Sequence, residues 1–164
     1  MKKSLSDKKV LITGAAGRIG SAITRACIEA NAYVIITDVS KDGLNYLSDQ
    51  FDTEQRKRLF TVVSDITEFE GIKYLINVAE EEFNHIDCAV HSAYPKSKSF
   101  GKSIEDLIMD DLCDNFKMQL ASAIIFSKEI IKHFLQSKGG NLLHISSIQG
   151  LGAPKFEHYK GTSM

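Results

Sequence analysis

Three evenly spaced glycines, between an apolar run and an amphipathic stretch, most restrict how this chain can fold. The apolar run at residues 10–12 is typical of a buried parallel strand, and from Ile19 onward apolar residues recur at helical spacing. The glycines at positions 14, 17 and 20 therefore lie where a strand turns into a helix. Such a turn lets backbone amides approach a pyrophosphate at the helix N-terminus, where unpaired N–H groups and the helix dipole favour an anion.

The glycine spacing leaves two interpretations open. It reads G-x-x-G-x-x-G, whereas the usual dinucleotide loop reads G-x-G-x-x-G, so a glycine-rich turn without a ligand remains an alternative. If the loop holds a cofactor, the residues that we expect to contact it are Gly14, Ala16, Gly17, Arg18 and Ile19.

An acidic residue follows the next apolar run and indicates which cofactor the loop would hold. Residues 33–37 predict a second buried strand, and it ends on Asp38, 24 residues after Gly14. About 20 residues is the separation expected for the carboxylate that binds the adenosine ribose, and a carboxylate there repels a 2′-phosphate. Asp38 therefore favours NAD over NADP, although Arg18 could reach toward a phosphate. The alternative role for Asp38 is a helix cap.

The remaining pattern alternates strands and helices. Further strands are predicted at residues 59–63, 86–90 and 141–145, and helices at 41–57, 67–83 (with Thr67 and Glu70 as a capping box) and 104–136, broken near 110–114. This alternation predicts an α/β fold with a doubly wound parallel sheet in the order 3-2-1-4-5, in one domain over residues 1–164. The apolar centre of residues 115–134 predicts a helix that is buried or lies at a subunit interface.

Composition excludes several classes of function. The formal net charge of −1 gives no reason to expect a nucleic acid or membrane partner, and no apolar run approaches the ~20 residues that span a bilayer. The three cysteines are odd in number and widely spaced, which indicates buried thiols in a reducing compartment. The five histidines show no metal-ligand spacing. We expect a cytoplasmic protein with a small-molecule substrate and no metal.

Four motifs in order resemble the short-chain dehydrogenase/reductase family over essentially the whole chain. Residues 13–20 resemble its glycine loop, with Arg18 in place of the middle glycine. Asp65-Ile66 resembles the pair that holds the adenine, and His91-Ser92-Ala93 takes the place of the Asn-Asn-Ala that lines the cofactor. Residues 145–150 resemble the strand-end motif whose second serine, here Ser147, is catalytic.

The resemblance implies a Rossmann-type sheet and an NAD(P)-dependent oxidoreductase. Hydride would pass between nicotinamide and an alcohol or carbonyl carbon, with Ser147 donating a hydrogen bond to the reacting oxygen. The alternative for Ser147 is a turn residue that closes a strand. The helical catalytic asparagine of the family falls on Gln119, with Asn115 one turn earlier.

The catalytic tyrosine of the family is the largest departure. The family needs a tyrosine four residues before a lysine, but Tyr159 is followed at that offset by Ser163. It also lies twelve residues after Ser147, one short of the usual interval. We therefore do not expect Tyr159 to be the catalytic tyrosine.

The last fifteen residues resemble one branch of the family. That branch includes oxidoreductases of bacterial surface-sugar pathways such as flagellin modification, whose similar insert precedes the Tyr-x-x-x-Lys pair; Ala93-Tyr94-Pro95 also resembles it. The resemblance implies a sugar or sugar-nucleotide substrate, a homo-oligomer (a dimer or tetramer) when full length, and a chain that stops before its catalytic pair and the last strands. The alternatives are a catalytically inactive nucleotide-binding module that acts through a partner and a purely structural domain.

Overall fold

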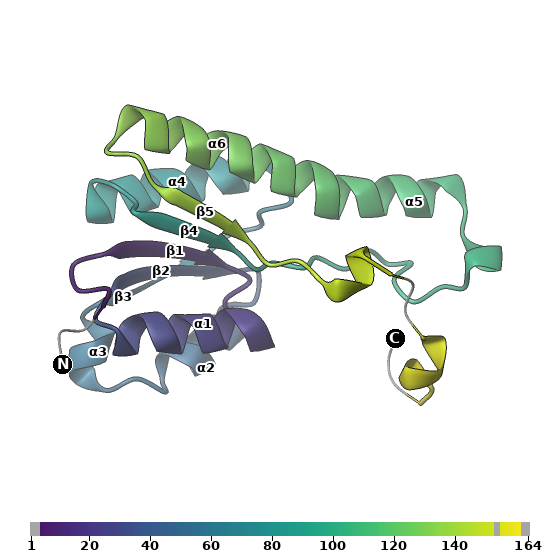
Figure 1. The fold of residues 1–164 in the computed structure, drawn as a ribbon, viewed down its shortest axis with the longest axis horizontal. Helices are drawn as coiled ribbons and strands as arrows, with labels where there is room; N and C mark the ends of the chain where they lie inside the picture. The colour runs from purple at the N-terminus through teal and green to yellow at the C-terminus, as the bar shows by residue number, and fades with distance from the viewer. Residues whose placement is uncertain (1–3, 153–154, 162–164) are drawn as a thin grey trace.

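The computed structural model describes residues 4–152 and 155–161 and contains one parallel sheet. Its strands are β1 (Lys9–Thr13), β2 (Tyr33–Asp38), β3 (Leu59–Val63), β4 (Cys88–His91) and β5 (Asn141–His144). They lie in the order β3-β2-β1-β4-β5, and every neighbouring pair is parallel (Figure 1). The predicted fold class and strand order are confirmed.

Helices cover both faces of the sheet. On one face lie α1 (Arg18–Glu29), α2 (Lys41–Ser48) and α3 (Thr53–Arg56), and on the other lie α4 (Phe69–Phe83) and α6 (Ser122–Gln136) (Figure 1). Alternate residues of each strand point to opposite faces, so Ile12 and Ile36 join one core while Leu11 and Ile35 join the other. The middle residues of β1 and β2 are apolar because both faces of the sheet are covered there, whereas the edge strand β5 is largely exposed.

A helical rod extends past the sheet. After η1 (Ile104–Asp106), α5 (Met109–Asn115) passes through a π-helical segment, η2 (Phe116–Ala121), into α6. The break predicted near residues 110–114 is wrong, because the chain is extended at Leu107 and Ile108 and then helical to Gln136. The carboxylate of Asp111 accepts a hydrogen bond from the Ile108 N–H at 3.3 Å, and acidic residues favour a helix start over a helix break.

Two helix starts also differ from the sequence predictions. The helix expected over residues 41–57 is two helices, because Asp52 caps α3 through a capping box with Gln55. The capping box predicted for Thr67 does not form, since its hydroxyl donates to Asp65 Oδ1 at 2.7 Å and α4 follows Glu68 without a side-chain cap.

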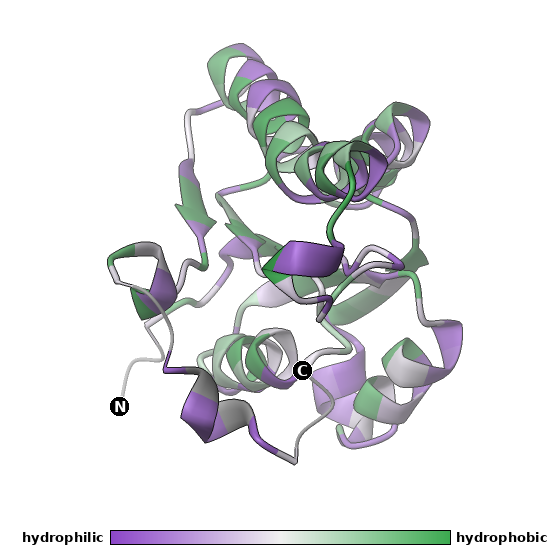
Figure 2. Cartoon of the chain, turned by 90° about the vertical axis from the view of Figure 1, so that its right-hand side faces the viewer, coloured by the Kyte–Doolittle hydropathy of each residue, from purple (hydrophilic) through white to green (hydrophobic). Residues whose placement is uncertain are grey.

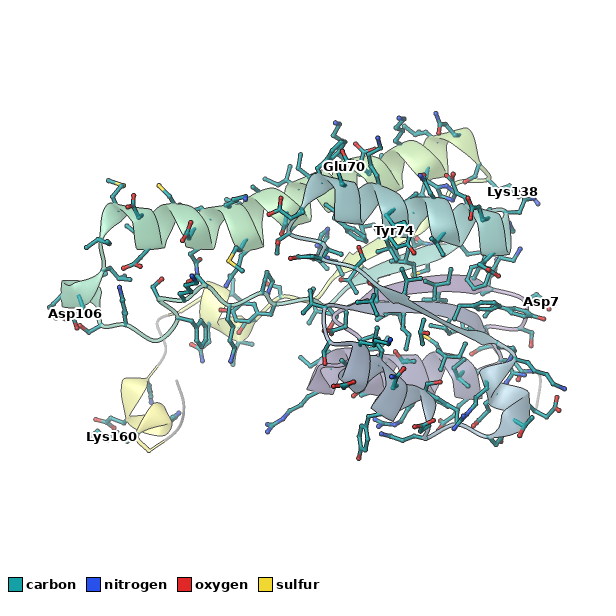
Figure 3. All side chains as sticks on the ribbon, turned by 180° about the vertical axis from the view of Figure 1, so that it is seen from behind. Asp7, Glu70, Tyr74, Asp106, Lys138 and Lys160 are labelled. Atoms are coloured by element: carbon teal, nitrogen blue, oxygen red, sulfur yellow. The ribbon has the colours of Figure 1, made fainter. Side chains whose placement is uncertain are left out.

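The carboxyl ends of all five strands lie on one side of the molecule, beneath the overhanging α5 (Figure 1). Figure 3 shows Asp106 at the far end of this overhang, while Asp7 and Lys138 lie at the opposite end. The segments η3 (Ile148–Gly150) and η4 (Phe156–Tyr159) follow β5 on the overhanging side. Doubly wound sheets bind ligands at this edge.

The packing of α1 on β1 generates a stability prediction for Gly20. A Cβ at this position would lie 2.2 Å from the Gly14 carbonyl oxygen, so we expect Gly20→Ala to lower the free energy of unfolding by about 1–3 kcal/mol despite the better helix propensity of alanine. Urea denaturation measures the change. Gly150→Ala is the matched control, because nothing lies within 4 Å of a Cβ there. Equal urea midpoints for the two variants would contradict this packing argument.

Candidate functional site

The turn between β1 and α1 leaves a helix N-terminus open. Gly14 has a φ of +65°, and a Cβ there would lie 2.5 Å from Ala93 Cα, so only glycine fits. Helix α1 begins after Gly17 with no side-chain cap and no acidic residue in its first turn. Gly17, Arg18 and Ile19 are exposed. This N-terminus presents backbone N–H groups to an anion such as a pyrophosphate.

The Asp38 carboxylate is fixed at the end of β2 by two backbone amides. Its Oδ2 accepts a hydrogen bond from the Ala16 N–H at 3.1 Å, and its Oδ1 accepts one from the Ser40 N–H at 3.0 Å. The side chain of Ser40, and not that of Asp38, caps α2 by accepting from the Gly43 N–H. Each carboxylate oxygen keeps further acceptor capacity, so Asp38 remains able to bind two neighbouring hydroxyls.

A cavity of about 130 Å³ opens between these strand ends. Five of the predicted cofactor residues line it: Gly14, Asp38, Asp65, Ile66 and Ala93. Its wall also includes Thr37, whose buried Oγ1 has no hydrogen-bond partner among the described residues. Acceptors at the mouth, an unpaired hydroxyl in the wall and an open helix N-terminus beside it fit an adenine dinucleotide.

The other predicted cofactor residues lie outside the cavity wall. Ala16, Gly17, Arg18 and Ile19 continue along the glycine loop, and His91 and Ser92 lie behind Ala93 at the end of β4. Sequence analysis missed the remaining wall residues, which are Thr37, Val39, Ser64, Thr67, Tyr94 and Pro95. These six residues share one feature in the sequence: each lies near a strand end and within two residues of a predicted cofactor residue.

His91 takes over the hydrogen bonding of an asparagine that the resemblance implies at its position. The Ala93 N–H donates to Thr13 Oγ1 at 3.3 Å, and we assign the Thr13 hydroxyl proton to His91 Nδ1, 3.0 Å away. The imidazole is buried and stacks on the Phe126 ring with centroids 5.0 Å apart. Burial first, and His144 second, lower the pKa of His91 to about 4, so the ring is neutral at pH 7.

Two further histidines lie in contrasting surroundings. His133 is buried, with Nε2 accepting from the Ile86 N–H at 3.0 Å and Nδ1 lying 2.6 Å from Glu80 Oε1. This contact holds α6 against α4. His144 is exposed, because β5 forms the edge of the sheet.

The two predicted catalytic residues occupy separate segments. Gln119 lies in the π-helical segment, and its Nε2 donates to the Pro95 carbonyl at 3.2 Å; such segments are frequent at functional sites. Ser147 is exposed and caps η3 by accepting from the Gln149 N–H at 3.1 Å, which leaves its hydroxyl proton available. No hydrogen bond joins the two side chains in the described part of the chain.

Some residues that the sequence analysis discusses near the end of the chain lie outside the described part of the structure. Ala153, Pro154, Ser163 and the rest of the 162–164 segment lie outside the described residues, as does the side chain of Tyr159. Within residues 4–152 and 155–161, no cluster of three or more histidines, cysteines or acidic residues could hold a metal ion. None of the helices in that same part is both long and apolar enough to span a membrane.

Comparison with known sequences decides the family. The sequence profile described as short chain dehydrogenase matches residues 8–162. The chain belongs to the short-chain dehydrogenase family. This short-chain dehydrogenase is 33% identical to post-translational flagellin modification protein A of Campylobacter coli over 98% of its own length and 63% of the relative's. It is 30% identical to 7alpha-hydroxysteroid dehydrogenase of Bacteroides fragilis, over 90% of its own length and 56% of the relative's.

Solved structures agree with the fold of this short-chain dehydrogenase. NAD+-bound xylitol dehydrogenase superposes with a TM-score of 0.77 at 21% identity, over 92% of this chain and 57% of that one. A short chain dehydrogenase from Bacillus anthracis superposes with a TM-score of 0.80 at 22% identity, over 90% and 58%. The chain therefore spans a little over half the length of each.

The neutral, buried His91 generates a prediction about pH. Its pKa is about 4 in the folded protein against 6.5 unperturbed, so between these values the unfolded state binds more protons and stability falls as the pH falls. From pH 7 to pH 5 we expect wild type to lose about 2 kcal/mol more unfolding free energy than His91→Asn, which keeps an acceptor for Thr13. Urea denaturation at both pH values measures this difference, and equal losses would contradict it.

Proposed function

We propose that this chain binds NAD(H) and forms the cofactor-binding part of an oxidoreductase. The observation that carries the proposal is the Asp38 carboxylate, fixed by the amide of Ala16 at the mouth of the cavity that Asp65 and Ile66 line. Asp38 would accept from both ribose hydroxyls, Ile66 would pack against the adenine, and Asp65 would accept from its amino group. Gly17 and its neighbours in α1 would bind the pyrophosphate through backbone N–H groups.

The charge at the cavity supports NAD over NADP. A 2′-phosphate would lie beside the Asp38 carboxylate, and like charges at this distance repel. Arg18 is the one cation within the glycine loop, but its side chain is exposed and would act through solvent. The sequence predicts three buried thiols, but only Cys27 is buried, while Cys88 is half-buried and Cys113 is exposed. All three are free thiols, which agrees with a reducing compartment such as the cytoplasm.

The bound nicotinamide would supply or accept the hydride exchanged with an alcohol or carbonyl carbon. Ser147 would donate its free hydroxyl proton to the reacting oxygen, an interaction typically worth a few kcal/mol in the transition state. One N–H of the Gln119 side-chain amide donates to the Pro95 carbonyl. The Oε1 atom of Gln119 could accept a hydrogen bond from a water or a substrate hydroxyl. Neither Ser147 nor Gln119 is the acid or base of the reaction. In the family that role belongs to a tyrosine with a lysine four residues later, and Tyr159 is followed at that offset by Ser163.

A sugar or sugar nucleotide is the substrate class that we favour. The support is the 33% identity to a protein named for flagellin modification and the sequence of residues 150–164, which resembles that branch. The 30% identity to a hydroxysteroid dehydrogenase makes a steroid the competing substrate.

An inactive nucleotide-binding module is the second candidate function. It is favoured by the absence of a lysine four residues after Tyr159 in the 164-residue sequence. Turnover decides between the two: NADH oxidation or NAD+ reduction with a panel of sugars supports the enzyme. Tight NADH binding without turnover supports the module.

The exposed side of the helical rod supports a homo-oligomer. Its large exposed apolar side chains are Met109, Leu112, Phe116, Leu120, Ile124, Ile131 and Leu135. Figure 2 shows hydrophobic bands recurring along the helices at the top of the molecule. Apolar surface of this extent usually marks an interaction site, and we propose a second copy of the chain as the occupant.

Asp38 gives the sharpest test of cofactor binding. We expect wild type to bind NADH more tightly than NADPH, and Asp38→Asn to weaken NADH binding about 10–100-fold because a charged acceptor is lost. NADPH should be affected less, since its 2′-phosphate is no longer repelled. Fluorescence titration of the reduced nicotinamide measures both affinities.

The control for the Asp38 experiment is Asp110→Asn, which removes an exposed carboxylate from α5, away from the cavity. It should leave both affinities unchanged. Equal NADH affinities of wild type and Asp38→Asn would show that Asp38 only accepts hydrogen bonds from the backbone of its own loops and does not bind the cofactor.

Self-association gives a separate test of the rod surface. We expect the wild-type chain to sediment as a dimer or larger species, and the double variant Leu120→Lys with Ile124→Lys to sediment as a monomer, because two buried apolar contacts become charged. Tyr46→Lys with Tyr74→Lys is the matched control on exposed apolar residues of α2 and α4. A monomeric wild type that binds no hydrophobic dye would contradict the proposed interface.

A further inference from the structure

A second cavity lies beyond the first, between the loop after β4 and the overhanging α5. Its volume is about 260 Å³, near the lower end of the ~300–1,000 Å³ of small-molecule sites. Tyr94 lines both cavities, so the second lies next to the proposed cofactor site. None of the roles assigned above uses it.

The wall of the second cavity contains a polar cluster fixed by contacts of its own. Ser97 and Ser99 are both buried, with their hydroxyl oxygens 3.0 Å apart. Asp111 Oδ2 accepts from the Lys102 ammonium at 2.7 Å and from the Ile108 N–H. Polar groups held in this way are pre-organised for a ligand, because their side-chain entropy is already lost.

Two other lining residues keep unused hydrogen-bonding capacity. Asn115 is half-buried, and its amide has no hydrogen-bond partner among the residues that the structure describes. The Tyr94 hydroxyl likewise has none within that part of the chain, and its ring is exposed and fixed edge-on against Phe100, with centroids 6.1 Å apart. An amide and a hydroxyl next to an exposed aromatic ring can bind a ligand that is polar at its rim and apolar on its face.

We propose that the cavity formed by Tyr94, Ser97, Ser99, Lys102, Asp111 and Asn115 binds the sugar ring of the substrate. This inference rests on the proposed oxidoreductase function and adds the residues that recognise the sugar. A pyranose ring carries donors and acceptors in its plane and C–H groups on its faces. The Asn115 amide matches the rim, and the Tyr94 ring matches a face.

The lining favours a sugar over a steroid. A steroid is a large apolar body with few polar groups, and it would leave the Asn115 amide and the Tyr94 hydroxyl of this small cavity without partners. A monosaccharide can pair with both groups at once. Specificity of this kind arises because a polar site rejects a ligand that cannot pair with it.

The test measures binding of free monosaccharides, because a nucleotide-linked sugar could also bind through its nucleotide. Saturation-transfer NMR on the 164-residue chain with a panel of hexoses and N-acetylhexosamines should show binding of at least one sugar. Asn115→Leu, which keeps the side-chain size, should weaken that sugar about tenfold or more and leave NADH affinity unchanged. Asn45→Leu, at an exposed position of α2, is the matched control and should bind both ligands as wild type does.

Each outcome separates this inference from the proposed function. NADH binding with no sugar binding, or with sugar binding that Asn115→Leu does not change, overturns the sugar site and leaves the cofactor proposal standing. Loss of NADH binding in wild type overturns the proposed function itself. Binding of cholate that Asn115→Leu weakens would show that the cavity takes a steroid, and it too overturns the inference.

Discussion

The close contact between the ends of β1 and β4 is the constraint on which the rest of this molecule depends. Gly14 lies so near Ala93 that a Cβ would meet its backbone, and Thr13 joins Ala93 to the buried His91 through its hydroxyl. This contact brings the glycine loop and the loop after β4 together at one edge of the sheet. The open N-terminus of α1, the Asp38 carboxylate and the first cavity are all positioned by it.

The two cavities adjoin at one edge of the sheet, because Tyr94 lines both. The first offers acceptors and an open helix N-terminus, which suit a dinucleotide, while the second offers a mixture of charged, hydroxyl and amide groups. Gln119 connects this edge to the rod by donating to Pro95 from within the π-helical segment.

The helical rod shows how one sequence pattern serves two surfaces. Phe126, Ile130 and Phe134 are buried against the sheet and α4, whereas Leu120, Ile124 and Leu135 are exposed on the same rod. The sequence pattern predicted a helix that is buried or lies at a subunit interface. The structure shows which side chains of the rod are buried and which are exposed. The buried His133 adds polar contacts to the Ile86 N–H and the Glu80 carboxylate. The apolar pattern did not predict these contacts, because both partners lie far from His133 in the sequence.

Local physical rules determined much of this protein from its sequence. Apolar runs and the glycine loop predicted the five strands, their order, Gly14 and Asp38, because parallel strands bring their carboxyl ends to one edge. The other predicted residues of the first cavity, Asp65, Ile66 and Ala93, came from the resemblance to the family. Tertiary contacts decided the rest. His91 is neutral because it is buried against Phe126, and the helix start at Met109 depends on the Asp111 carboxylate. The second cavity lies between the overhanging α5 and the loop after β4 that precedes it, and the periodicity of the sequence did not predict how these neighbouring segments pack.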